Sequence, residues 1–218
     1  MIPLRDSHPA NIFPFWVLTI IGLNIYAFYL TLTNSSPDAF IFSYGLIPNL
    51  VDFSNWGTFL PFITSQFLHG GFVHIISNML FLWVFGDNVE GRLGFILFPI
   101  FYLAAGVAGG LAQYLLNPTS AIPMIGASGA VAGVLGAYFA MFPHHSVRTL
   151  VPIFGFFSII NIPAQFMLFY WFITQLFSGT ASITTAASDI GGVAFFAHIG
   201  GFVFGWIVGS MFKTKNVD

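Results

Sequence analysis

The sequence predicts an all-α membrane protein, a bundle of six transmembrane helices with both termini in the cytoplasm. Only 6% of the 218 residues are charged and 57% are apolar, whereas about a quarter of the residues of a typical soluble domain are charged. The mean hydropathy is +0.88. A chain with so few charges cannot cover a water-exposed surface with polar groups, so lipid is expected to be its main solvent.

The first three predicted spans lie in the N-terminal half. A spanning helix needs about 20 mostly apolar residues, and Phe13–Leu32 meets this requirement. Asn34–Gly57 is polar and contains two prolines, which predicts a long loop. The short apolar stretch Thr58–Leu68 then leads into a second span over His74–Phe85. The third span covers Leu93–Leu116, which carries no charge.

The last three predicted spans follow an Asn-Pro-Thr-Ser turn. Ala127–Phe142 is the fourth and is shorter than the others. Leu150–Phe177 is long and aromatic and contains two prolines, and Ile190–Phe212 is the last apolar run. Each run is bounded by polar or turn-forming residues, which is the pattern of separate helices.

The basic residues give the orientation of this bundle. With the N-terminus inside, every basic residue lies on the cytoplasmic side, namely Arg5, Arg92, Arg148, Lys213 and Lys215. The loops assigned to the outer side contain no Lys or Arg and carry the acidic residues Asp38, Asp52 and Asp189. This is the distribution that the positive-inside rule predicts. We therefore expect one membrane domain over 13–212, with cytoplasmic segments at 1–12 and 213–218.

Residue usage argues against several functional classes. The formal net charge is −2 and no basic block is present, so no nucleic acid partner is expected. The chain has no Cys, which excludes a disulfide framework and a thiolate metal site. No Glu follows a His, as the H-E-x-x-H motif of zinc proteases would require. We expect no metal and no cofactor.

Three polar clusters interrupt the apolar runs. They are His69, His74 and Asn78 at the second span, Ser128 at the start of the fourth, and His198 in the sixth. Polar side chains are costly in hydrocarbon and tend to face a bundle interior or a wet cavity. In the expected topology all three helices enter from the outer side, and His198 lies about 12 Å into its helix. The clusters therefore converge at one shallow depth.

These residues carry the parts of a serine hydrolase. Ser128 offers a hydroxyl nucleophile between glycines that permit close approach, and His198 offers a base because neutral imidazole accepts a proton near neutrality. Asn78 offers an amide NH2, His74 lies four residues earlier on the same helix face, and the Ser128 N–H lies at a helix N-terminus. The nearest acid, Asp189, is nine residues before His198. The sequence predicts a Ser–His dyad whose imidazole is oriented by packing.

Each feature also has a structural interpretation. His198 and Asn78 could each serve only as an interhelical hydrogen bond. His69 is expected to anchor a loop, and His144 and His145 to be solvated. Small residues let membrane helices pack closely, and this is the expected role of Gly129, Gly133, Gly136, Gly201 and Gly205. The joint pattern favours chemistry over these separate explanations.

Three motifs resemble the rhomboid family of intramembrane serine proteases, in its six-helix bacterial-type form, over roughly Thr58–Gly205. They are HGGFVHIISNMLFLWVFGDNVEGRLG, with the spacing G-x-x-x-E-x-x-x-G, then IGASGAVAG, and finally AHIGGFVFG. The resemblance implies that Ser128 is the nucleophile and His198 the base. It implies an oxyanion pocket formed by His74, Asn78 and the Ser128 amide, with the Gly126 amide assisting.

The resemblance also implies an activity and a location. The chain is expected to hydrolyse a peptide bond in or near the transmembrane segment of membrane-protein substrates, within the lipid bilayer of a prokaryotic plasma membrane. Substrates would enter laterally beside the fifth span.

Glu90 and Arg92 are expected to tie the turn after the second span into the third. Ala132 departs from the pattern, because some members have there a tyrosine that supports the histidine ring.

Two alternatives belong to other functional classes. One is a catalytically inactive rhomboid-like protein that recognises membrane helices, although such a protein would usually lack Ser128 or His198. A small-solute transporter is the other, but the repeated halves with broken helices found in many transporters are absent. Labelling by a serine-reactive fluorophosphonate separates the protease from both. The sequence sets neither the natural substrate nor the oligomeric state.

Overall fold

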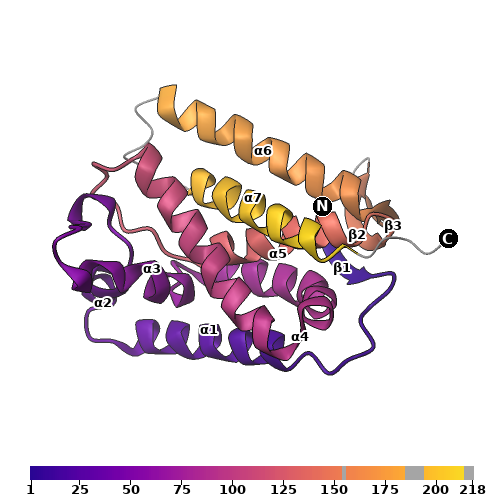
Figure 1. The fold of residues 1–218 in the computed structure, drawn as a ribbon, viewed down its shortest axis with the longest axis horizontal. Helices are drawn as coiled ribbons and strands as arrows, with labels where there is room; N and C mark the ends of the chain where they lie inside the picture. Colours follow the sequence, from indigo (N-terminus) through magenta and orange to yellow (C-terminus); the bar gives the residue numbers. More distant parts are fainter. Residues whose placement is uncertain (154–155, 185–193, 214–218) are drawn as a thin grey trace.

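Helices packed side by side form most of the molecule, and a small sheet lies at one end (Figure 1). The structure is a computed structural model that describes residues 1–153, 156–184 and 194–213. Its α-helices are α1 (Phe15–Thr33), α2 (Pro37–Tyr44), α3 (Pro61–Thr64), α4 (Phe72–Leu116), α5 (Ser128–Met141), α6 (Ala164–Thr184) and α7 (Phe195–Met211). Short 3-10 turns are η1 (Pro48–Leu50), η2 (Trp56–Phe59) and η3 (Ser65–Phe67), and the strands are β1 (Ile2–Asp6), β2 (Ser146–Ile153) and β3 (Phe156–Pro163).

Helix α4 is two helices joined at a sharp bend. Gly94 has φ 81° and ψ 172°, a conformation that glycine adopts without the steric cost of a Cβ atom. The residues before and after it correspond to the second and third predicted spans. By length and composition, α1 and α4 are apolar enough to cross a membrane, while α5 and α7 are apolar but shorter.

Helices α5 and α7 approach each other closely because glycines line their contact. A Cβ atom at Gly201 would collide with the carbonyl of Gly129, and one at Gly205 would collide with the carbonyl of Gly133. Gly136 faces the backbone of α7 in the same way. These contacts confirm the packing role expected for the small residues. They also fix α7 against α5 over most of its length (Figure 1).

The G-x-x-x-E-x-x-x-G stretch of α4 joins it to α1. A Cβ atom at Gly86 would lie 2.7 Å from Cγ2 of Val17, so glycine lets the two helices touch. The Glu90 carboxylate accepts the backbone N–H groups of Trp16 at 2.9 Å and Val17 at 3.0 Å and thus caps the start of α1. Sequence reasoning placed the bonds of Glu90 in the third span, and this was wrong. Arg92 lies against the C-terminal ends of α5 and α7.

A three-stranded antiparallel sheet, ordered β1-β2-β3, replaces part of the predicted fifth helix. The helix expected over Leu150–Phe177 begins only at Ala164, so the all-α prediction is wrong for these strands. Pro152 and Pro163 disfavour a helix interior, and alternating Val, Thr and Ile residues favour extended structure. Strand β1 shows in addition that the N-terminal segment packs on the body of the protein. Phe154, which the predicted fifth span includes, lies outside the described residues.

Candidate active site

A cavity of about 840 Å³ lies among α4, α5 and α7, with α6 and the η3 turn at its edges. It is lined by all the site residues that the sequence predicts: Ser128, His198, His74, Asn78 and Gly126. They come from segments up to 124 residues apart, since His74 and His198 lie at opposite ends of the set. The fold therefore brings the three polar clusters to one hollow. The chemical roles assigned to these residues remain predictions.

Ser128 is the first residue of α5, and the backbone before it is shaped by Gly126. Gly126 has φ +125°, a region that residues with a Cβ atom rarely adopt. A Cβ atom there would lie 2.6 Å from Nε2 of His74 and 3.6 Å from Oγ of Ser128. Glycine thus keeps the space between these two side chains open. Backbone N–H groups in the first turn of a helix have no intrahelical acceptor, which suits Ser128 for binding a negative oxygen.

The amide of Gly126 has a different partner from the one that the resemblance implies. Its N–H donates to the Ser65 carbonyl at 2.9 Å. An amide already used in this way is not free to donate to a substrate oxygen. We therefore correct the predicted oxyanion role of Gly126: its contribution is the conformation and the space at the entrance to α5.

His198 is held by a side chain that the sequence analysis missed. Its Nδ1 lies 2.7 Å from Oε1 of Gln175 in α6, and the Trp171 ring lies 5.6 Å away, tilted by 34°. Nε2 of Gln175 donates to Thr174 Oγ1 at 3.2 Å, which agrees with Oε1 facing the imidazole. Because an amide oxygen only accepts, this bond assigns the ring proton to Nδ1 and leaves the Nε2 lone pair free.

The expectation that packing alone orients His198 was incomplete. Trp171 and Gln175 are separated from His198 by 27 and 23 residues, so no local spacing links them. The available signal was a glutamine within an apolar helix, because buried polar groups in such helices usually have partners. Asp189, the acid nearest to His198 in the sequence, lies outside the described residues.

Asn78 is also held in place by a neighbouring histidine. Its Nδ2 lies 3.0 Å from Nε2 of His69, and the rings of His69 and His74 are 5.0 Å apart, edge to face. His69 is 1% exposed and Asn78 7%. Since an amide NH2 has two hydrogens, one can bond His69 while the other remains for a ligand in the cavity. His69 thereby anchors the loop before α4, as expected.

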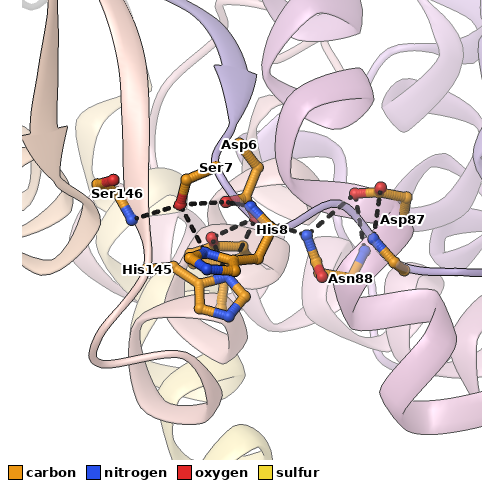
Figure 2. A network of polar contacts seen from close by, with 9 residues as sticks. Asp6, Ser7, His8, Asp87, Asn88, His145 and Ser146 are labelled. Carbon is orange, nitrogen blue, oxygen red and sulfur yellow. Dashed lines mark hydrogen bonds and ion pairs between the residues drawn. The ribbon is translucent and has the colours of Figure 1, made fainter.

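A second polar network lies outside this cavity, at the sheet end of the molecule (Figure 2). The half-buried His145 lies 3.0 Å from the Tyr138 hydroxyl and 3.3 Å from Oδ2 of Asp6, so the prediction that it is solvated was wrong. His144 is exposed, as expected. Within the described ranges, the one His/Asp group with spacing suitable for a metal is Asp6, His8 and His145.

The comparisons with known proteins agree on one family. The sequence model of the Rhomboid domain matches residues 56–215. Rhomboid protease GluP of Bacillus subtilis (strain 168) is 35% identical over 127 residues, which are 57% of this chain and 24% of that protein. The mitochondrial presenilin-associated rhomboid-like protein A of Danio rerio is 29% identical over 161 residues, covering 69% of this chain and 37% of the relative.

A plant relative gives the same picture. Rhomboid-like protein 11, chloroplastic, of Arabidopsis thaliana is 34% identical over 120 residues, which are 55% of this chain and 39% of the relative. The chain thus spans between 24% and 39% of the length of these three relatives.

Proposed function

The chain belongs to the rhomboid family of integral membrane proteins, and from this membership and the cavity we propose that it is an intramembrane serine endopeptidase. Its substrates are membrane proteins, cut in or near a transmembrane segment. The observation that carries the proposal is the single cavity lined by Ser128, His198, His74 and Asn78. A hydroxyl, a base and hydrogen-bond donors around one hollow are the parts that acyl transfer needs.

Ser128 and His198 perform the covalent steps. The lone pair of Nε2 takes the proton of the Ser128 hydroxyl while Oγ attacks the carbonyl carbon of the scissile bond. The imidazolium then gives this proton to the leaving nitrogen as the C–N bond breaks, which yields an acyl-enzyme and a free amine. Water then attacks the ester carbon while the same nitrogen takes its proton, and this proton passes to Oγ of Ser128 as the C–O bond breaks and the acid leaves. Gln175 supports both halves by holding the Nδ1 proton.

The negative carbonyl oxygen is stabilised by donors on α4 and α5. The proposed donors are the Ser128 N–H, the second amide hydrogen of Asn78 and a proton on His74, whose residues all line the cavity, and Gly126 keeps open the space between His74 and Ser128. The bond from Asn78 to His69 fixes the direction of the amide before the substrate arrives. Such preorganised donors avoid a rearrangement in the transition state.

The membrane arrangement belongs to the same proposal. We place six spans in the membrane, with both termini in the cytoplasm of a prokaryotic cell and the cavity near the outer surface. The bend at Gly94, which divides α4, and the one-sided distribution of basic residues support this arrangement. A cavity close to the outer surface can take up the water that hydrolysis consumes.

Covalent labelling tests the nucleophile directly. The purified protein in detergent should react with a fluorophosphonate at Ser128, with the adduct located by mass spectrometry of the digested chain. Ser77→Ala is the matched control, because Ser77 lines the same cavity and its hydroxyl donates to the His74 carbonyl. Ser77→Ala should label normally and Ser128→Ala should not label. Reaction at another serine, or none on a folded protein, would refute the assignment.

A further inference from the structure

The network at the sheet end contains three metal-ligating side chains that the proposed catalysis does not use. Asp6 ends β1, His8 follows two residues later, and His145 lies in the turn between α5 and β2. Antiparallel pairing of Asp6 with Val147 brings these segments together. One ligand atom of each side chain lies within 4.8 Å of those of the other two. Figure 2 shows the group with its hydrogen-bonding neighbours.

The Asp6 carboxylate is buried and oriented by other donors. Its Oδ2 accepts the Tyr138 hydroxyl at 2.5 Å and Nδ2 of Asn88 at 2.6 Å, and its Oδ1 accepts the backbone N–H of His8 at 3.0 Å. Carboxylates that bind metals are commonly held by outer hydrogen bonds of this kind. Asp6 is 4% exposed, so its negative charge is costly unless a positive charge lies beside it.

One distance in this group already suits a small divalent cation. Ligands about 2.0–2.1 Å from a tetrahedral zinc ion lie about 3.3–3.4 Å from one another. Nδ1 of His145 and Oδ2 of Asp6 are 3.3 Å apart. The rings of His8 and His145 have centroids 4.8 Å apart, and His8 is exposed, so its side chain can turn toward the ion without disturbing the core.

We propose that Asp6, His8 and His145 bind one divalent transition-metal ion of the zinc class. Imidazole and carboxylate ligands without thiolate select such ions over Mg²⁺ or Ca²⁺, which prefer oxygen ligands alone. Ser7 is placed beside the group, since its hydroxyl lies 2.7 Å from Nδ1 of His8, and it or a water molecule completes the coordination. The ion ties the N-terminal segment to the end of α5.

This metal site is separate from the candidate active site. Tyr138, which bonds Asp6, follows Ser128 by ten residues on α5, a distance of about 15 Å along the helix. The proposal therefore does not depend on the proposed protease activity. It departs from the sequence analysis, which expected no metal because it considered only the H-E-x-x-H pattern and thiolate ligands.

Cobalt titration tests the site on the full chain. The untagged protein, stripped of metal by a chelator in detergent, should bind one Co²⁺ per chain with visible absorption bands, and Zn²⁺ should displace it. His8→Ala should weaken binding by at least about tenfold. His144→Ala is the matched control, because His144 neighbours His145 but lies outside the group, and it should bind like the wild type.

A second readout separates metal binding from folding. Zn²⁺ should raise the melting temperature of the wild type and of His144→Ala but not that of His8→Ala. His8 is exposed, so His8→Ala without metal should melt like the metal-free wild type. Asp6→Asn keeps the shape of the side chain and should also lose Co²⁺ binding. Absence of saturable binding to the wild type, or equal binding by His8→Ala, would overturn the proposal.

Discussion

The bond between His198 and Gln175 defines which imidazole nitrogen can act as a base. Nδ1 donates to Oε1 at 2.7 Å, so Nε2 is the ring nitrogen that keeps a lone pair. In many serine hydrolases a carboxylate has this orienting role. A neutral amide orients the ring without adding charge inside an apolar helix bundle. Trp171 lies beside the same ring, whereas Ala132 has no aromatic side chain that could support it.

Removing this acceptor should reduce catalysis more than binding. Gln175→Leu is expected to lower kcat about tenfold, the worth of one hydrogen bond of about 1–1.5 kcal/mol, and to leave KM nearly unchanged. Gln175→Glu retains an acceptor and should keep more of the rate. Steady-state kinetics and melting curves on the same preparations check this. A normal kcat for Gln175→Leu would remove Gln175 from the mechanism.

Asn78 should raise kcat by donating a hydrogen bond to the oxyanion. Loss of one such donor typically lowers kcat by about 10²–10³-fold, so Asn78→Ala should be slow while fluorophosphonate still reaches Ser128. His69→Ala should be slow to a smaller degree, because it frees the Asn78 amide to rotate. A purely structural Asn78 would instead give a lowered melting temperature with a normal kcat.

The sequence reveals the residues that would act on the substrate better than the residues that hold them in place. Ser128, His198 and Asn78 stand out because each is polar within an apolar run that ends close to one surface. Gln175 reaches His198 from a different helix, and Gly126 donates its backbone N–H to the Ser65 carbonyl. Both hydrogen bonds join separate segments of the chain, so no local spacing of residues indicates them.

At the scale of elements, apolar composition alone misassigned the stretch before α6. Residues 146–163 are largely apolar, but β-branched residues and Pro152 favour a hairpin that pairs with β1. Strand β1, which pairs with β2, lies more than 130 residues earlier in the sequence. The residues around β2 therefore do not indicate that a partner strand is present. The bend at Gly94 lies one residue inside the third predicted span, Leu93–Leu116, so composition located this helix boundary closely without identifying the glycine that forms it.

The capping of α1 by Glu90 can be tested by substitution. Its carboxylate accepts two N–H groups at the start of α1, so Glu90→Gln loses a charge and one acceptor. We expect a destabilisation of about 2 kcal/mol and a clear fall in melting temperature, with kcat of the folded fraction preserved. Asp52→Asn is the control, because Asp52 is exposed and bonds Ser54 within its own loop. Equal melting temperatures for the two variants would contradict the capping role.

For the whole molecule, the proposed membrane topology puts the two ends of α5 on opposite faces. The chain has no Cys, so single cysteines can be introduced without background. In intact cells, Thr119→Cys should react with an impermeant thiol reagent from outside, whereas His144→Cys should react only after permeabilisation. Both positions are exposed. The opposite labelling pattern would invert the bundle, and labelling of both from one side would exclude a spanning α5.

At the scale of the whole molecule, the fold is expected to assemble a working Ser128–His198 dyad inside a membrane. The most direct measurement is cleavage of a single-span test protein by the purified enzyme in liposomes, followed over time by gel and mass spectrometry. The wild type should cut within or beside the span, and Ser128→Ala, His198→Ala and the double variant should be equally inactive while remaining folded, because the two groups act as one unit. Cleavage by the folded Ser128→Ala protein at the wild-type rate would show that Ser128 is not the nucleophile.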